Sequence, residues 1–433
     1  MVDVAEVHIW NTFVGAVRWD PTQQLAQFQY DPAFIQNGYD ISPIKMPLSG
    51  GSVVHSFPTL RKGKTDSEDT FKGLPGLLAD ALPDKYGNKL ISAWLAKNGR
   101  PENSMNPVET LCFIGKRAMG ALSFEPAQLK AGTKSFSLEL TSLIDIAKKI
   151  LNQRGDFVTD LSEDEENAML DILKIGTSAG GARPKAIIAY NPKTHEVRSG
   201  QGIAPKGFNH YLLKLDGVSG EQFGESLGWG RVEYAYYLMA SDCGIDMMPC
   251  KLVKENGRAH FMTQRFDRTQ NEKHHIQTLC GLQHHDFNDM YGYSYEQVFQ
   301  TMRQLRLTYP EAEQMFRRMV FNVLATNYDD HTKNFSFILK QDRNWQLAQA
   351  YDLCFSYDPS NHWVSQQTLS VNGKRLQITK DDLMTVARDN NIKKGAHIIE
   401  QINDVVNQWA RYAKKASVRS DLAEHIANHL NTF

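Results

Sequence analysis

Apolar and polar side chains alternate in several short runs near the start of the chain. The clearest runs are residues 13–17 and 25–30, and Asn, Asp, Pro and Gly lie between them. Alternation with a period of two places every second side chain on one face, as in a β-strand that buries one side. The first sixty residues are therefore predicted to be rich in strands. Further strands are predicted at 186–190, 210–215, 251–253 and 259–263.

In the last half of the chain, apolar residues recur every three or four positions, which is typical of amphipathic helices. One run opens at Glu233, and others cover 295–306 and 311–325. Ser142 and Ser162 are suited to cap two earlier helices. These patterns predict an α+β fold with a β-rich N-terminal half and an all-helical C-terminal lobe. The predicted parts are a β-rich subdomain at 1–126, a second lobe at 140–268 and the helical lobe at 269–433.

Composition narrows the class of protein. With 433 residues, 41% of them hydrophobic, the chain can bury a large core, and its net charge of −1 argues against a molecule that binds nucleic acid through overall charge. Five cysteines without a Cys-x-x-Cys pair are typical of reduced thiols. The first residues do not resemble a signal peptide, and no run approaches the roughly 18 apolar residues of a membrane span. We therefore expect a soluble, cytoplasmic protein.

The candidate chemistry begins with a polar cluster at residues 327–337, between a helical run and an alternating run. Asn334 follows Asp329 at the spacing that protein kinases use for a Mg²⁺ ligand and a catalytic base. We predict that Asp329 accepts the proton of a substrate hydroxyl. Lys333 would help to neutralise phosphate charge. His331 is either a phosphate contact or a packing residue, and the sequence leaves both open.

A second acidic residue follows one hairpin later. Residues 335–339 alternate, residues 340–344 are suited to a turn, and residues 345–350 are suited to a return strand. Such a hairpin would bring Asp352 back beside Asn334. The two side chains are then predicted to hold Mg²⁺ across the nucleotide phosphates.

Two features could bind those phosphates. The small residues at 176–185 precede a strand and would let backbone N–H groups approach an anion closely, although an ordinary tight turn explains them too. Lys214 lies among apolar neighbours in a predicted strand, where it is either a phosphate-binding lysine oriented by Glu233 or a solvent-facing lysine. The segment 264–268 would form the hinge that meets adenine. Four histidines between residues 270 and 290 could suggest zinc, but their spacing favours a mobile loop.

Taken in order, these segments resemble the HipA family, the toxin kinases of bacterial type II toxin–antitoxin pairs, over nearly the whole chain. The matching segments are Gly73-Leu74-Pro75-Gly76, Leu82-Pro83-Asp84, Met119-Gly120-Ala121-Leu122, Ser178 to Lys185, Gln264 to Arg268, Asp329 to Ser336 and Tyr351-Asp352. The resemblance implies a protein-kinase-like, two-lobed fold that uses ATP and Mg²⁺ to phosphorylate Ser or Thr. It implies an aminoacyl-tRNA synthetase as substrate, with glutamyl-tRNA synthetase as the leading candidate. It also implies a HipB-like antitoxin as partner and operator DNA bound through that complex.

The resemblance also assigns roles to matching residues. Asp329 matches the base, Asn334 and Asp352 the metal ligands, and Lys214 the phosphate lysine. Ser178 matches a serine whose autophosphorylation inactivates the kinase, as added negative charge would repel ATP. Asp330 stands where Gly is usual, Gln264 stands where Glu is frequent, and Arg183-Pro184 stiffens the loop. The implied ATP contacts are Gly180, Gly181, Ala182, Arg183, Pro184, Lys185, Lys214, Gln264, Arg265, Phe266, His331, Thr332, Lys333, Asn334, Tyr351, Asp352, Leu353 and Cys354.

Two rival functions share this pattern. A small-molecule phosphotransferase uses an Asp and an Asn in the same roles. Alternatively, the chain is mainly a corepressor in a DNA complex, with weak kinase activity. Lys393, Lys394, Lys414, Lys415 and Arg419 make the C-terminal region locally basic, but a solvated helix face also explains them.

Overall fold

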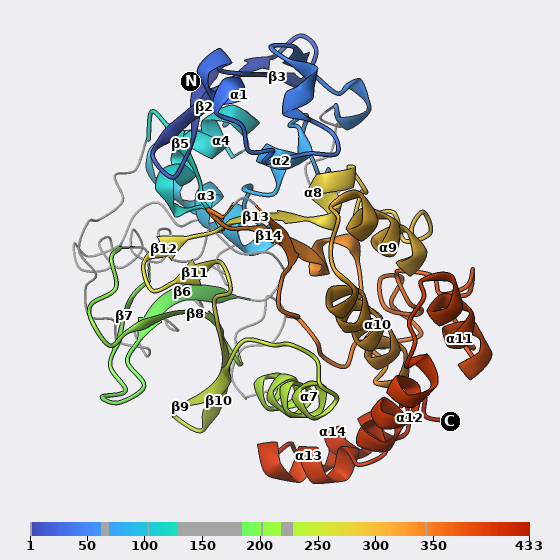
Figure 1. The fold of residues 1–433 in the computed structure, drawn as a ribbon. Helices are drawn as coiled ribbons and strands as arrows, with labels where there is room; N and C mark the ends of the chain where they lie inside the picture. The colour runs from blue at the N-terminus through green and yellow to red at the C-terminus, as the bar shows by residue number, and fades with distance from the viewer. Residues whose placement is uncertain are drawn as a thin grey trace. The chain divides into compact units, whose positions relative to one another are not determined.

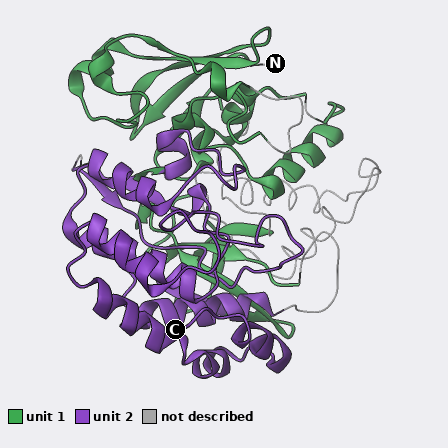
Figure 2. Cartoon of the chain, turned by 90° about the vertical axis from the view of Figure 1, so that its right-hand side faces the viewer, with its two compact units in different colours: residues 1–227, 253–277 green, residues 228–252, 278–433 purple. Residues whose placement is uncertain are grey.

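The computed structural model describes residues 2–61, 69–102, 104–127, 184–200, 202–217, 228–342 and 344–433. The predicted phosphate loop up to residue 183, Ser178 within it, and the helices predicted after Ser142 and Ser162 lie outside these residues. The chain forms two compact units (Figure 2). Unit 1 comprises residues 1–227 and 253–277, and unit 2 comprises residues 228–252 and 278–433.

Unit 1 begins with the predicted β-rich segment. Its five-stranded sheet has the order β4-β3-β2-β1-β5 and is antiparallel throughout. In β1 the alternate residues Ala5, Val7 and Ile9 are buried, so the period of two does place one face in the core. The strands are β1 (Val4–Ile9), β2 (Thr12–Asp20), β3 (Leu25–Tyr30), β4 (Val54–His55) and β5 (Leu122–Glu125).

Three helices of unit 1, α1, α3 and α4, begin at side-chain caps. Asp84 caps α3 by accepting a hydrogen bond from the Gly87 N–H at 2.7 Å, and Asn106 caps α4 in the same way. The prediction of a helical corner around residues 73–87 is confirmed. The bounds are α1 (Pro32–Asn37), α2 (Gly76–Ala79), α3 (Lys85–Lys97) and α4 (Pro107–Ile114).

A second sheet of unit 1 carries the strands predicted beyond residue 184. Its order is β7-β6-β8-β10-β9, and the last three residues of β9 belong to this unit. All six residues of β6 are buried, and Ile187 and Leu213 pack with Leu90 of α3 and Phe113 of α4 in one core. The strands are β6 (Lys185–Tyr190), β7 (Val197–Ser199), β8 (Asn209–Lys214), β9 (Cys250–Glu255) and β10 (Arg258–Gln264).

The histidine-rich segment is not the mobile loop that we predicted. It forms β11 (Arg268–Thr269), β12 (Glu272–Lys273), β13 (His275–Thr278) and α8 (Leu279–Gln283). His275 is 1% exposed, and its ring nitrogen lies 2.8 Å from the carbonyl oxygen of Ile41. His274 and His275 are therefore part of the buried structure of unit 1.

Unit 2 is mainly helical (Figure 1). Its long central helix α10 packs against α9 and α12. The predicted hairpin is confirmed as β14 (Ser336–Leu339) paired antiparallel with β15 (Trp345–Leu347), which the all-helical description leaves out. The helices are α7 (Trp229–Asp242), α8, α9 (Tyr295–Gln304), α10 (Tyr309–Leu324), α11 (Lys380–Asp389), α12 (Gly395–Val406), α13 (Trp409–Ala416) and α14 (Ser420–Ala427). Among the described helices, none is both long and apolar enough to cross a bilayer.

Candidate active site

The segment that carries Asp329 begins where α10 ends. The Asn327 N–H donates to the Asn322 carbonyl at 2.9 Å, and the Asn327 side chain donates to that of Asn322 at 3.0 Å. The Tyr328 N–H donates to the Ser356 carbonyl at 3.1 Å, which ties the segment to the chain beyond Asp352. These bonds fix the two residues that precede Asp329.

Asp329 and Asn334 lie together, as their spacing predicts. The Asn334 side-chain amide donates to the Asp329 carbonyl at 2.7 Å, across the short 3₁₀ helix Thr332–Asn334. The bond uses the amide nitrogen, so a cation would meet the amide oxygen. The Asp329 side chain is 46% exposed, which leaves its carboxylate accessible to a substrate.

Asp352 follows the hairpin in an uncommon backbone conformation. Its φ is +56°, a left-handed value that costs a non-glycine residue about 1–3 kcal/mol and is found preferentially at functional sites. The preceding Tyr351 holds the hairpin end in place, because its hydroxyl donates to the Lys333 carbonyl at 2.6 Å and lies 2.5 Å from the Ser336 hydroxyl. The metal-ligand prediction is consistent with this donor set, since carboxylate and amide oxygens suit Mg²⁺.

His331 and Lys333 flank one aromatic ring. The Lys333 ammonium lies 4.3 Å from the centre of the Phe287 ring, and the His331 ring lies 5.4 Å from it. His331 Nε2 is also 3.8 Å from an Asp329 carboxylate oxygen. Of the two roles left open for His331, these contacts favour packing beside the predicted base.

The unusual Asp330 is a buried structural residue. It is 1% exposed, and its carboxylate accepts hydrogen bonds from the Tyr295 hydroxyl at 2.7 Å and from the Thr368 and Leu369 N–H groups at 2.7 and 3.3 Å. Burial raises the pKa of Asp330 to about 7, against the lowering effect of these bonds. Asp330 thus joins the segment of the predicted base to residues 368–369.

In unit 1, Lys214 ends β8 between two cross-strand neighbours, Lys185 of β6 and Phe261 of β10. Its ammonium lies 5.9 Å from the centre of the Phe261 ring. The Lys185 side chain is 2% exposed, and its ammonium lies 2.7 Å from an Asp84 carboxylate oxygen. A phosphate contact for Lys185 stays a prediction, but here the lysine forms a buried ion pair. Glu233, predicted to orient Lys214, is 3% exposed within α7 of unit 2.

The predicted adenine hinge contains a second buried ion cluster. Arg265 donates to both carboxylate oxygens of Asp267, at 2.7 and 2.6 Å, and Arg268 pairs with the same carboxylate. The Gly120 N–H donates to Asp267 at 2.8 Å. Although burial opposes it, the two guanidiniums hold the pKa of Asp267 well below its usual range. The Arg265 side chain therefore has a partner within the unit, and the predicted contacts of Gln264 to Phe266 with adenine stay predictions.

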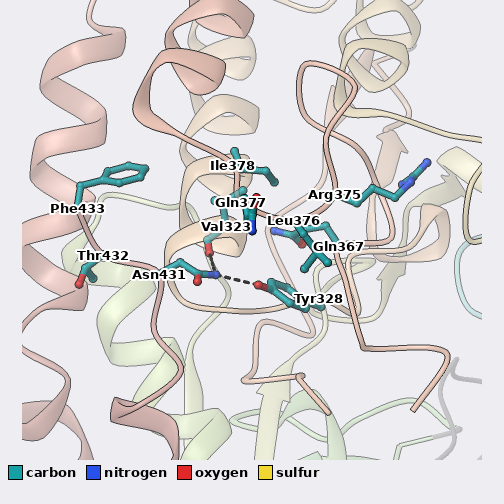
Figure 3. A pocket seen from close by; sticks show the side chains of 10 residues that line it. All are labelled: Val323, Tyr328, Gln367, Arg375, Leu376, Gln377, Ile378, Asn431, Thr432 and Phe433. Carbon is teal, nitrogen blue, oxygen red and sulfur yellow. Dashed lines mark hydrogen bonds between the residues drawn. The ribbon is translucent and has the colours of Figure 1, made fainter. Parts of the chain in front are cut away.

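Unit 2 also contains a cavity of about 200 Å³ that adjoins the segment of the predicted base at Tyr328 (Figure 3). Asn431 donates to the Tyr328 hydroxyl at 2.9 Å and to the Val323 carbonyl at 3.1 Å at its edge. None of the predicted site residues that the structure describes lines this cavity. It is lined by Val323, Tyr328, Gln367, Arg375, Leu376, Gln377, Ile378, Asn431, Thr432 and Phe433.

Comparison with known proteins matches residues 5–125 to the HipA N-terminal domain and residues 177–412, more than half of the chain, to the HipA-like C-terminal domain. The chain belongs to the HipA family. Among solved structures it is similar to HipA of Shewanella oneidensis, in a complex with HipB and its operator DNA. The TM-score is 0.68 at 18% identity, over 98% of this chain and 94% of that one. This HipA-family fold agrees with the predicted α+β, kinase-like class.

A curated relative, a putative kinase of Haemophilus influenzae, is 26% identical over 193 residues. The match covers 41% of this chain and 52% of the relative, so the chain spans about half the length of that protein.

Sequence reasoning missed two positions in unit 1. Asp84 belongs to a segment that we interpreted only as a helical corner, and Gly120 belongs to one that had no assigned role. The sequence feature that could have singled them out is that both lie in segments that match the HipA family in the same order along the chain. Their partners, Lys185 and Asp267, lie far along the chain and could not be inferred from local pattern.

Proposed function

We propose that this HipA-family protein is an ATP- and Mg²⁺-dependent Ser/Thr protein kinase. The observation that carries the proposal is the arrangement of Asp329, Asn334 and Asp352. The Asn334 amide donates to the Asp329 backbone carbonyl at 2.7 Å, the Asp329 carboxylate is exposed, and a second carboxylate follows at Asp352 on left-handed backbone. A base for a hydroxyl and two oxygen ligands for a cation are the side chains that phosphoryl transfer requires.

In this mechanism Asp329 accepts the proton of the substrate hydroxyl as the γ-phosphoryl group is transferred. Asn334 and Asp352 would hold Mg²⁺ through their oxygens, and the cation would neutralise charge on the phosphates. Lys214 would add a fixed positive charge to the phosphate oxygens. The protein's contribution is positioning and electrostatic stabilisation, because the transfer itself needs little covalent help.

Transfer of labelled γ-phosphate by the purified full chain tests the activity. At a Mg²⁺ concentration that half-saturates wild type, Asp352→Asn should strongly reduce labelling, whereas Asp342→Asn, an exposed carboxylate in the β14–β15 turn, should leave it unchanged. Equal labelling by wild type and Asp352→Asn would contradict the proposal. Labelling of small alcohols but of no protein would favour a small-molecule phosphotransferase instead.

We further propose the substrate and partners that the family resemblance implies. The substrate would be an aminoacyl-tRNA synthetase, first of all glutamyl-tRNA synthetase, with growth arrest as the result. The protein would autophosphorylate on Ser178, and phosphopeptide mass spectrometry after expression tests both sites. A HipB-like antitoxin would bring the protein to operator DNA, as in the Shewanella complex. A mobility shift that needs the antitoxin and weakens with salt would support that role.

A further inference from the structure

The lysine pair at the ends of β6 and β8 poses an electrostatic problem. Lys185 and Lys214 are directly opposite each other in the antiparallel register. Directly opposite side chains project from the same face of a sheet, with Cβ atoms about 5 Å apart, and like charges there destabilise the pairing. An anion beside one of the two lysines would relieve this repulsion.

Asp84 supplies that anion from a distant part of the chain. One of its carboxylate oxygens lies 2.7 Å from the Lys185 ammonium, and the other accepts the Gly87 N–H at 2.7 Å. The side chains of Lys185 and Asp84 are only 2% and 7% exposed. The carboxylate is itself fixed, because it caps α3, whose residues Tyr86 and Leu90 pack in the same core as Ile187 and Leu213.

We propose that Asp84 is a positioning residue for the nucleotide phosphates. By holding Lys185 inward, it fixes the first residue of β6 and assigns phosphate binding to Lys214, the half-buried lysine of the pair. Lys185 is then the partner of Asp84 and not a phosphate ligand. This inference rests on the proposed kinase function. It implies that the Leu82-Pro83-Asp84 segment positions the lysines of the predicted nucleotide site.

Comparing ATP with adenosine separates this role from a general loss of structure. Adenosine lacks phosphates, so a change in phosphate binding weakens ATP alone, whereas structural damage weakens both ligands. Isothermal titration of the full chain would give both affinities, in the presence of Mg²⁺. For Asp84→Asn we expect ATP affinity to fall by about tenfold or more, because the uncompensated charge of Lys185 would displace Lys214 and cost its one charge-assisted hydrogen bond to the phosphates, with adenosine affinity unchanged.

The double variant Asp84→Asn/Lys185→Met removes both charges together. If Lys185 only pairs with Asp84 and does not contact phosphate, the ATP affinity of the double variant should return to within a few-fold of wild type. The matched control is Glu109→Gln, a carboxylate 2% exposed that pairs with Arg100 at 2.9 Å in the same unit. It should leave the ratio of ATP to adenosine affinity unchanged.

Three outcomes would overturn the inference alone: unchanged ATP affinity in Asp84→Asn, equal loss of ATP and adenosine, or a double variant as weak as the single one. The last would show that Lys185 itself contacts phosphate. Wild-type protein that bound ATP no better than adenosine would overturn the proposed function, and this inference with it.

Discussion

The two units hold their predicted site residues in opposite ways. In unit 2 the acidic residues Asp329 and Asp352 are positioned by backbone bonds and by the neutral side chains of Asn334 and Tyr351. In unit 1 the basic side chains of Lys185 and Arg265 are each paired with a buried carboxylate. Lys185 and Arg265 are thus buried together with an anion, whereas the Asp329 side chain is 46% exposed.

The largest effect should come from substituting the acidic residues of unit 2, Asp329 and Asp352. Asp329→Asn removes the base but keeps the hydrogen-bond geometry, so we expect kcat to fall by about 10²–10⁴-fold with the KM for ATP little changed. Asp352→Asn should instead raise the Mg²⁺ concentration needed for half-maximal activity. Steady-state kinetics over a Mg²⁺ titration distinguishes the two, and identical profiles for both variants would refute the separate roles.

The next largest effect should come from the buried ion cluster of unit 1, in which Arg265 and Arg268 pair with Asp267. Asp267→Asn leaves Arg265 and Arg268 buried without their anion, and breaking a buried pair typically costs about 3–5 kcal/mol. We expect the free energy of unfolding of the full chain, measured by denaturant titration, to fall accordingly. Asp421→Asn, which breaks the exposed pair with Arg419, should produce no measurable change. Equal stability of the Asp267 variant would show that the cluster contributes little.

Asp330 should make stability depend on pH. Its folded pKa of about 7 lies above the value near 3.9 of an unfolded Asp, so the folded protein binds the extra proton between these values. Its contribution to stability is fully present below about pH 4 and is lost as the pH rises through 7. Relative to Asp330→Asn, wild type should lose on the order of a few kcal/mol between pH 4 and pH 8. A difference independent of pH would contradict the raised pKa.

Tyr351→Phe should give the smallest effect. It removes the hydroxyl bonds to Lys333 and Ser336, which we expect to cost about 1 kcal/mol of stability and to lower kcat only several-fold. Thermal unfolding and kinetics on the same preparation measure both quantities. A loss as large as that of Asp352→Asn would mean that the tyrosine itself takes part in the reaction.

Sequence reasoning succeeded where neighbours along the chain decide the structure. The period of two predicted the first sheet, and a turn between alternating runs predicted the hairpin that leads to Asp352. It failed for pairs that only the fold brings together. The partner of Gly120 lies 147 residues away, and Asp330 reaches residues 35 to 39 positions distant. No local sequence pattern predicts such pairings. Asp330, which stands where glycine is usual, therefore looked like a departure from the family, although its carboxylate joins distant segments by hydrogen bonds.

The division of the chain also bears on how the protein is made. The end of β9 and all of β10 belong to unit 1, although they follow α7 of unit 2 in the sequence. A ribosome synthesising this chain releases Lys214 well before β10, the strand that pairs beside it. Domains generally fold as units during synthesis. Unit 1 therefore cannot be completed before residue 277 has been synthesised, and until then α7 lacks the later helices of its own unit.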